Sequence, residues 1–440
     1  MEVRSRFASH LGWQVAFSAA WLLLARLAVA VPVEDTAPHW LTTWATAQQL
    51  IANIPQSGPP PRSQPPPTAL KSPIAPVPDA IDDQTVRMIV HLSAGGSKVR
   101  VQLANSHGNS AVTIGEAHIA RSAGGATIVA GSDHLLSFGG RPGVQIPPGA
   151  LVLSDPVDLP VSPATDLSVS LYVPGRTSGL TIHPLGLHST FILQGNAAAA
   201  LAPQPVSDNL SYFWLADVDV LAPSGAEAIA AFGDSITDGF ATTPNANRAW
   251  PTLLYERLRA ADLKSASAVI NLGISGNRVL HDGAGASALA RFGRDILGRP
   301  QVRCVVLLEG INDISYPNVP GTAASDRISA EDLIAGYRML IAEAHLHGIR
   351  ILGGTLLPWE GVWTFSADAE QLRIKVNEWI RSGGAFDGVV DFDTATRDPA
   401  HPSRLLPRFD SGDHVHPNDA GNRAMADAID LKYLAHLGIR

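Results

Sequence analysis

The feature that most constrains the fold is a change in hydrophobic pattern near Glu227. Between about Gln84 and Val220, apolar and polar residues alternate in short segments that are separated by Gly, Pro, Asn and Ser. Such segments are typical of antiparallel strands with one face in the core. After Glu227 the apolar residues come in short continuous runs instead. These runs indicate strands buried on both faces, as in a parallel sheet, so the chain combines two architectures.

The alternating segments predict a β-rich domain, which we place at residues 31–222. The segments are TVRMIVHLS (85–93), KVRVQLANS (98–106), AVTIGEAHIA (111–120), ALVLSDPVDL (150–159) and DLSVSLYVPG (166–175). Several short strands at this spacing predict a β-sandwich or jelly roll.

The continuous runs predict an α/β domain, which we place at residues 223–440. The runs are EAIAAF (227–232), SAVINL (267–272), RCVVLLE (303–309), IRILGGT (349–355) and GVVDF (388–392). Between them, helical spacing of apolar residues occurs in 250–261, 331–348 and 371–383, the last with a stripe of Leu372, Val376 and Trp379. This alternation predicts a three-layer α/β/α domain around a parallel sheet, whose ligands bind beyond the carboxyl ends of the strands.

Two segments have compositions of their own. The basic residues Arg4 and Arg6, the apolar run VAFSAAWLLLA (15–25) and the small residues before Val31 predict a signal peptide at 1–30. A membrane anchor is the alternative, but a bilayer needs about 20 apolar residues. We therefore expect a secreted or periplasmic protein. The ten prolines of residues 55–78 predict an exposed proline-rich loop.

Charge and cysteine content restrict the partners and the chemistry. The 440 residues carry a formal net charge of −8 and contain no dense block of Lys and Arg. We therefore expect no nucleic-acid partner, and no stable membrane insertion once the signal peptide is removed. The single cysteine, Cys304, cannot form an internal disulfide. Its apolar surroundings predict a buried structural thiol.

Polar residues follow three of the predicted parallel strands. After the first comes Gly233-Asp234-Ser235, where the glycine allows a sharp turn and Ser235 begins a helix. The free N–H groups of a helix start suit a developing oxyanion, although Ser235 or Asp234 could equally be a simple helix cap. Gly276 follows the second strand and offers either a further N–H donor or a plain turn.

Asn312 follows the third predicted strand within Gly310-Ile311-Asn312-Asp313. Its neutral amide can donate to an oxyanion, or it can simply form a turn.

A histidine near the C-terminus supplies the base that a serine nucleophile needs. His416 is that candidate, and Asp413, three residues earlier, can fold back to hold its imidazole. The same residues could instead form a surface turn before the last helices. Two neighbours compete for these roles, Ser275 and His414. We favour His416 over His414, on the expectation that the two side chains point to opposite sides of an extended segment and only one reaches Ser235.

Together these blocks resemble the SGNH (GDSL-type) hydrolases over roughly residues 227–440. The matching motifs are Gly233-Asp234-Ser235, Gly276, Gly310-Ile311-Asn312-Asp313 and Asp413-x-x-His416. The resemblance implies a serine ester hydrolase without metal or organic cofactor. It implies Ser235 as nucleophile, with His416 and Asp413 completing the triad. The N–H groups of Ser235 and Gly276 and the side chain of Asn312 would form the oxyanion hole.

The sequence around these motifs is similar to that of a subgroup of secreted bacterial and fungal SGNH esterases linked to xylan-type deacetylation. The similar segments are AFGDSITDG, NLGISGNRVL, LEGINDI and GDHVHPNDAG, with TTWATAQQ and LANSHGNSAVTIGEAHIA in the N-terminal β-rich module. This resemblance implies a small-molecule or polysaccharide ester as substrate, with acetyl the first choice of acyl group.

Other functions remain open at this point. An α/β-hydrolase needs Gly-x-Ser-x-Gly, which neither Ser235 nor Ser275 has. The closest histidine pairs, at 345/347 and 414/416, lack the His-Glu-x-x-His frame of many metal hydrolases. A glycosidase could use paired carboxylates from Asp234, Asp238, Asp313 and Asp413. A carbohydrate-binding protein with an inactive α/β domain is the alternative outside enzymes, with Trp40, Trp44 and Trp214 as residues that stack on sugars or fill the core.

Overall fold

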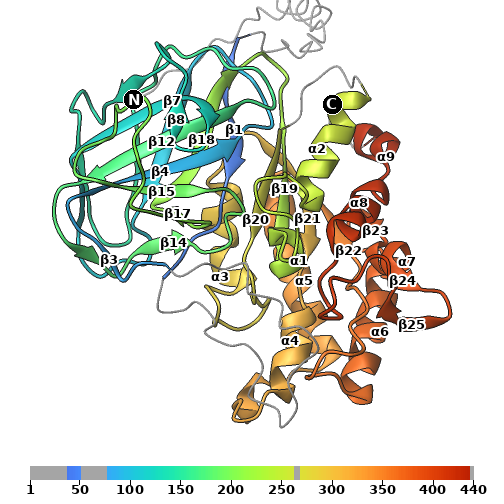
Figure 1. Ribbon diagram of the computed structural model, residues 1–440. Helices are drawn as coiled ribbons and strands as arrows, with labels where there is room; N and C mark the ends of the chain where they lie inside the picture. The colour runs from blue at the N-terminus through green and yellow to red at the C-terminus, as the bar shows by residue number, and fades with distance from the viewer. Residues whose placement is uncertain (1–36, 51–76, 262–267, 437–440) are drawn as a thin grey trace, which may run out of the picture. The chain divides into compact units, whose positions relative to one another are not determined.

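The continuous apolar runs form one parallel sheet in the computed structural model, which describes residues 37–50, 77–261 and 268–436 (Figure 1). Its strands are β19 (Ala228–Gly233), β20 (Ala268–Gly273), β21 (Val302–Leu308), β22 (Arg350–Gly354) and β23 (Gly388–Val390). They lie in the order β20-β19-β21-β22-β23, and every neighbouring pair is parallel. Because the strand order reverses at β19, a crevice is expected beyond the carboxyl ends of β19 and β21.

Helices connect these strands and follow them to the end of the described chain. They are α1 (Ser235–Asp238), α2 (Trp250–Ala260), α3 (Ala288–Phe292), η2 (Gly293–Leu297), α4 (Ile311–Ser315), η3 (Tyr316–Asn318), η4 (Ala324–Asp326), α5 (Ala330–Leu346), α6 (Ala367–Ser382), α7 (Phe392–Thr396), α8 (Asp419–Asp427) and α9 (Leu431–His436), with the hairpin β24 (Arg397–Asp398) and β25 (His401–Leu405) after α7. The five predicted strands and the three long helices are all present. We call β19 to α9 the α/β part.

The buried face of α6 is broader and more polar than the predicted apolar stripe. The predicted stripe was Leu372, Val376 and Trp379. Only the valine is fully buried, whereas the polar residues Arg373 and Asn377 of the same helix are buried too. Each donates a 2.8 Å hydrogen bond to the carbonyl oxygen of Leu356. Polar side chains can fill this face because their hydrogen-bonding groups are satisfied there.

The alternating segments form antiparallel sheets, which we call the β-rich part. Its strands are β1 (His39–Ala45), β2 (Gln49–Leu50), β3 (Ala80–Ile81), β4 (Gln84–His91), β5 (Val99–Ala104), β6 (Val112–Ile114), β7 (Glu116–Gly124), β8 (Thr127–Ile128), β9 (His134–Leu136), β10 (Val144–Ile146), β11 (Leu151–Leu153), β12 (Asp166–Val173), β13 (Thr177–Ser178), β14 (Thr181–His183), β15 (Thr190–Gln194), β16 (Ser207–Asn209), β17 (Tyr212–Phe213) and β18 (Leu215–Ala222). The larger sheets have the orders β1-β18-β5-β11 and β16-β15-β4-β12-β7-β8, with β9 also on β7.

The β-rich and α/β parts belong to one compact unit that begins at Ala37. Strand β1 of the β-rich part packs against β20, the edge strand of the parallel sheet. A hydrogen bond of 3.1 Å from the N–H of Val269 to Oγ of Ser93 joins the two parts there. The buried apolar residues of both parts form one continuous cluster. The β-rich part therefore borders the parallel sheet at β20, the neighbour of β19.

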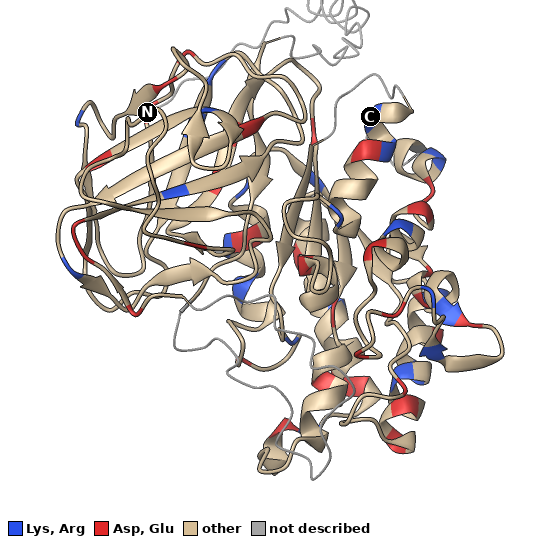
Figure 2. Cartoon of the chain, in the orientation of Figure 1, with Lys and Arg blue, Asp and Glu red and all other residues tan. Residues whose placement is uncertain are grey.

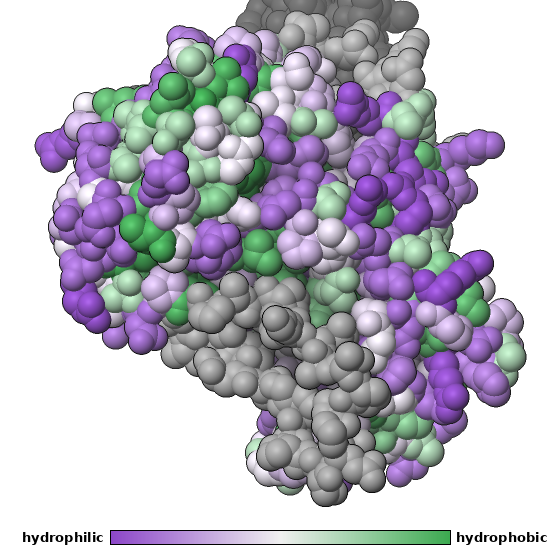
Figure 3. Space-filling view, in the orientation of Figure 1, coloured by the Kyte–Doolittle hydropathy of each residue, from purple (hydrophilic) through white to green (hydrophobic). Residues whose placement is uncertain are grey.

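Charged and apolar residues are distributed differently over the two parts. Figure 2 shows acidic and basic residues interspersed along the C-terminal helices, whereas the strands of the β-rich part are mostly uncharged. In Figure 3, apolar areas of the β-rich part lie among hydrophilic residues. Among the helices that the structure describes, none is long and apolar enough to cross a membrane. Cys304 in β21 is buried, as predicted, and burial raises the pKa of its thiol.

Some predictions fall outside the described residues. The signal peptide at 1–30 lies there, and so does the proline-rich loop at 55–78 apart from its last two residues. The domain boundaries at 31–222 and 223–440 stay predictions.

Candidate active site

Ser235 is the first residue of α1, directly beyond the carboxyl end of β19. The preceding residue, Asp234, caps this helix by accepting a 3.0 Å hydrogen bond from the N–H of Ile236. Ser235 is 7% exposed. No hydrogen bond joins its N–H to another described residue. The N–H of this helix start is therefore free to bind an oxygen atom of a ligand.

Gly233 serves close packing rather than the sharp turn that the sequence suggested. It is the last residue of the extended strand β19, and its φ is not positive. A Cβ atom at this position would lie 2.1 Å from the carbonyl oxygen of Leu308 and 2.4 Å from Oγ1 of Thr237. The glycine is required because β21 and α1 both approach the backbone here.

The structure brings Ser235, His416 and Asp413 together in one chain of hydrogen bonds. Nε2 of His416 lies 2.8 Å from Oγ of Ser235, across 181 positions of sequence. Nδ1 of His416 lies 2.5 Å from Oδ2 of Asp413. Because a carboxylate can only accept, Nδ1 carries the ring proton and Nε2 is left to accept the proton of the serine hydroxyl.

The loop before α8 fixes the carboxylate of Asp413. Its Oδ1 accepts hydrogen bonds from the N–H groups of Val415 (3.1 Å) and His416 (2.9 Å). Burial alone would raise the pKa of Asp413, but the neighbouring imidazole and these N–H donors outweigh it and hold the pKa well below its usual range. Asp413 is therefore ionised at neutral pH. The ring of Phe240 covers His416, with 4.2 Å between the ring centroids.

Gly276 and Asn312 stand at the ends of the two strands that flank β19. Gly276 has a φ of 80°, and its N–H donates no hydrogen bond to a described residue. Asn312, in α4, uses its Nδ2 to donate a 2.9 Å hydrogen bond to the carbonyl oxygen of Asn277. An amide NH₂ has two protons, so one remains for a ligand. The expected donors thus occupy adjacent strand ends.

A buried carboxylate holds the loop that contains Gly276. Asp313 accepts hydrogen bonds from the N–H groups of Val279 (2.8 Å) and Leu280 (3.0 Å). Nε of the buried Arg291 also donates to Oδ1 of Asn277 at 2.8 Å. Both contacts fix the backbone on the C-terminal side of Gly276.

Three carboxyl groups that follow β19 and β21 are buried. Burial raises the pKa of Asp234 to about 7, of Glu309 to about 8 and of Asp313 to about 6. Asp234 and Asp313 also raise the pKa of Glu309 by repulsion, whereas the ion pair with Arg291 opposes the rise.

The two competing residues have other partners. The hydroxyl of Ser275 donates to Oδ2 of Asp238 at 2.8 Å. His414 has a φ of 72° and pairs with Asp410 at 2.7 Å. The reason that the sequence suggested for excluding His414 was wrong: alternate residues of an extended segment share a side, and it is the left-handed backbone of His414 that directs it elsewhere.

The carboxylates proposed for a glycosidase are each engaged within the protein. Asp234 caps α1, Asp313 accepts two backbone N–H groups, and Asp413 holds His416. The fourth, Asp238, accepts hydrogen bonds from Ser275 and His183. These contacts favour structural roles over a pair of acid and base groups that face a sugar.

Aromatic side chains of the β-rich part differ in accessibility. Trp214 is fully buried, which leaves no face for a sugar. Trp40 lies under the guanidinium of Arg100, 4.2 Å from it. Trp44 is half-buried and packs edge-on against Tyr212.

Among the residues that the structure describes, no group of three or more His, Cys, Asp or Glu side chains is arranged to hold a metal ion.

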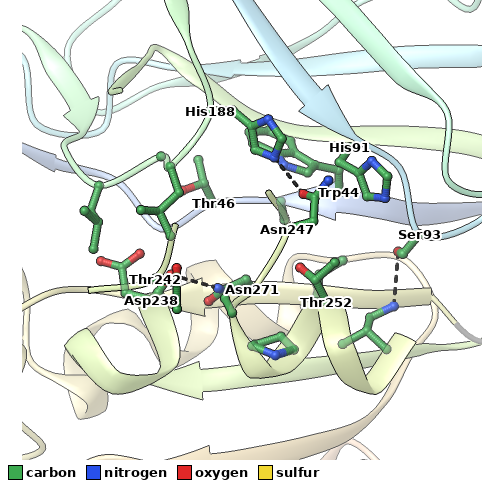
Figure 4. A pocket seen from close by; sticks show the side chains of 18 of the residues that line it. Trp44, Thr46, His91, Ser93, His188, Asp238, Thr242, Asn247, Thr252 and Asn271 are labelled. Atoms are coloured by element: carbon green, nitrogen blue, oxygen red, sulfur yellow. Dashed lines mark hydrogen bonds between the residues drawn. The ribbon is translucent and has the colours of Figure 1, made fainter. Parts of the chain in front are cut away.

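A separate cavity of about 90 Å³ lies between the β-rich part and α1, β20 and α2 (Figure 4). Its wall includes Trp44, His91 and His188 from one side and Asp238 and Asn271 from the other. Ser235 and His416 do not line it. The cavity is therefore distinct from the triad, although Asp238 connects the two through α1.

No sequence signal pointed to His183 of β14, which lies 3.0 Å from Asp238. A lone histidine in the apolar segment before β15 carries no motif. Its position became apparent only once the packing of the β-rich part on α1 was known.

Comparison with known families identifies the α/β part. Residues 231–424 match the model of the GDSL-like Lipase/Acylhydrolase family. This segment is a domain of that family, and the protein is a carboxylic ester hydrolase. No curated protein matches the chain.

Similar solved structures cover about half of the chain. They include Axe2, an acetylxylan esterase from Geobacillus stearothermophilus, with 22% identity over 49% of this chain and 96% of that one and a TM-score of 0.37. A GDSL-like lipase from Bacteroides thetaiotaomicron has 19% identity over 48% and 89%, with a TM-score of 0.36. LAE5, an α/β hydrolase enzyme from the metagenome of Lake Arreo, Spain, has 21% identity over 48% and 95%, with a TM-score of 0.37.

Proposed function

We propose that the protein hydrolyses acyl esters through a covalent acyl-enzyme on Ser235. The observation that carries this proposal is the continuous contact from Oγ of Ser235 through His416 to Asp413, at 2.8 and 2.5 Å. His416 takes the hydroxyl proton as Oγ attacks the ester carbonyl, and returns it to the leaving alcohol. Water, activated by the same imidazole, then hydrolyses the acyl-enzyme. Asp413 keeps the ring in the tautomer that both steps need.

The tetrahedral intermediates of both steps carry an oxyanion that needs donors. We assign this role to the N–H groups of Ser235 and Gly276 and to Nδ2 of Asn312. The two backbone N–H groups are without partners among the described residues, and the amide has a proton to spare. Donors held in place before the reaction need no reorganisation as charge develops, which is why they lower the barrier.

We further propose an acetyl ester of a carbohydrate, such as a xylan-type polysaccharide, as the substrate. The support is the resemblance of the segments around Ser235, Gly276, Asn312 and His416 to secreted polysaccharide esterases. We also propose that the chain folds into a jelly-roll-like β-rich domain followed by a three-layer α/β/α domain of the SGNH type. The protein would be exported after cleavage of residues 1–30, so the exported chain would begin at Val31.

The experiment is hydrolysis of aryl acetates, aryl esters of longer acyl chains, and acetylated xylan by wild type and Ser235→Ala. We expect turnover by wild type, fastest for acetyl, and turnover at least about 10⁴-fold lower in the variant. Ser315→Ala is the matched control, because this partly buried serine bonds to Thr364 outside the triad. Retained turnover by Ser235→Ala would contradict the serine mechanism and favour the carboxylate-based alternative.

A further inference from the structure

Asp238, the last residue of α1, has a buried carboxylate that contacts both parts of the molecule. Oδ2 accepts hydrogen bonds from the N–H (3.0 Å) and the hydroxyl (2.8 Å) of Ser275. Oδ1 lies 3.0 Å from Nε2 of His183 in β14. One carboxylate therefore links the β-rich part to the loop that follows β20.

The contacts of His183 define its protonation. Nδ1 lies 2.6 Å from the carbonyl oxygen of Ala47, and Nε2 faces the carbonyl oxygen of Leu185 as well as Asp238. All of these partners accept hydrogen bonds, whereas a neutral imidazole has only one N–H. The ring satisfies both sides when it carries both protons. Burial would lower the pKa of His183, but the charge of Asp238 and the accepting oxygens outweigh it and raise the pKa. His183 and Asp238 thus form a buried ion pair.

The ion pair helps to fix the backbone on the N-terminal side of Gly276. The residue after Gly276, Asn277, is held by Arg291 and Asn312 of the α/β part. The residue before it, Ser275, has Asp238 as the partner of both its N–H and its hydroxyl. The position of the Gly276 N–H therefore depends on Arg291 and Asn312 from one side and on Asp238 from the other.

The backbone of Asp238 is fixed independently of His183. A Cβ atom on Gly273 would lie 2.2 Å from the backbone nitrogen of Asp238, so α1 rests directly on β20. Nδ2 of Asn271 also donates to the carbonyl oxygens of Thr237 (2.9 Å) and Asp238 (3.2 Å), and the second of these bonds is drawn in Figure 4. Loss of His183 should therefore leave α1 in place and free mainly the carboxylate.

We propose that His183 of the β-rich part is a positioning residue for ester hydrolysis. By holding the carboxylate of Asp238, it keeps Ser275 and the adjacent N–H of Gly276 in place at the oxyanion hole. This inference rests on the proposed serine mechanism. It also gives the β-rich part a direct role in the reaction, separate from any contact with substrate.

The test compares two amide substitutions of the same residue. The amide nitrogen of Gln stands near the Nε2 position of His, so His183→Gln can still donate to Asp238. The amide nitrogen of Asn stands near Nδ1, so His183→Asn can donate only to Ala47. We expect kcat for an aryl acetate to fall about 10- to 100-fold in His183→Asn and less than about 3-fold in His183→Gln. KM should change less than about 3-fold in both, and thermal melting checks that each variant is folded.

The outcomes separate the positioning role from a purely structural one. Equal kcat in the two folded variants, or wild-type kcat in His183→Asn with a lower Tm alone, would overturn the inference. Ser235→Ala, assayed in parallel, isolates the proposed function. If it retains wild-type turnover, the serine mechanism fails and the inference fails with it. If it is inactive while the two amide variants behave alike, only the inference fails.

A second variant covers the case in which His183→Asn does not fold. Ser275→Ala removes only the hydroxyl that donates to Asp238 and leaves the N–H contact. We expect a fall in kcat of about 3- to 10-fold with KM unchanged, because this side of Gly276 is held less firmly. An unchanged kcat in a folded Ser275→Ala protein would contradict the path from Asp238 to Gly276.

Discussion

The carboxylate of Asp413 and the imidazole of His416 are joined by two contacts, 2.5 Å to Nδ1 and 2.9 Å to the backbone N–H. The first contact selects the tautomer of the ring, and the second shapes the turn between the two residues. Only three positions separate them, so this half of the triad is formed locally. Ser235 comes from the other end of the α/β part, and it requires the whole parallel sheet to reach His416.

Asp413→Asn should lower kcat for an aryl acetate by about 10⁴-fold. The amide can donate to Nδ1 and so stabilise the wrong ring tautomer, an effect of this size in another serine hydrolase. The matched control is His414→Asn, since His414 pairs with Asp410 and Asn tolerates its positive φ. Steady-state kinetics should find the control within about 2-fold of wild type. Comparable losses in both variants would mean that the turn, rather than the tautomer, is what matters.

Asn312→Ala should lower kcat by about 10²–10³-fold with little change in KM, the scale for one oxyanion donor in a serine protease. Asn318→Ala is the control, because its Nδ2 likewise donates to a backbone carbonyl oxygen, of Thr364 at 2.7 Å, but outside the site. The same kinetic assay on both variants is sufficient. If Asn312→Ala has wild-type kcat, Asn312 does not bind the oxyanion.

Gly233→Ala should destabilise the fold by about 3 kcal/mol or more, because the new Cβ would meet the carbonyl oxygen of Leu308 at 2.1 Å. Gly225→Ala is the comparison. Gly225 has a φ of 81°, but a Cβ atom there would have no neighbouring atom within 4 Å, so this variant should lose only about 1–2 kcal/mol to backbone strain. Urea unfolding followed by circular dichroism measures both. A smaller loss at Gly233 than at Gly225 would refute the close-packing explanation.

Glu309→Gln should become more stable relative to wild type as pH rises. Burial raises the pKa of Glu309 to about 8, so the folded wild type keeps a proton that the unfolded chain releases above about pH 4. The stability that depends on this proton is complete below about pH 4 and is lost as pH rises to about 8, by up to about 1.4 kcal/mol per pH unit. Glutamine has no proton to lose.

Urea unfolding at several pH values from 4 to about 9 measures the difference between Glu309→Gln and wild type. It should grow with pH and level off above about 8. Glu378→Gln, an exposed position on α6, should follow wild type throughout. A Glu309→Gln curve parallel to wild type would show that the carboxyl group ionises in the folded protein as easily as in the unfolded chain.

The fold and the candidate triad could be predicted largely from local pattern. The continuous apolar runs marked all five strands of the parallel sheet, and Ser235, Gly276 and Asn312 follow the strands β19, β20 and β21. These three residues lie close together because the carboxyl ends of parallel strands meet at one edge of the sheet.

The sequence was less informative where a role depends on contacts between distant segments. Gly233 was explained by a turn, whereas its neighbours in space, β21 and α1, are what require a glycine. His183 carried no signal, since its partner Asp238 lies 55 positions away in a different part of the fold. The buried Arg373 in α6 likewise depends on the backbone of Leu356, which no helical periodicity reveals.

Covalent labelling with an alkyl fluorophosphonate, followed by mass spectrometry of the digested protein, tests the serine mechanism most directly. We expect one adduct per chain, on Ser235, with loss of aryl-acetate turnover in proportion to labelling. His416→Ala should slow the labelling by at least about 10²-fold, because the hydroxyl loses its base. An adduct on another residue such as Ser275, or full turnover after Ser235 has been labelled, would show that Ser235 is not the nucleophile.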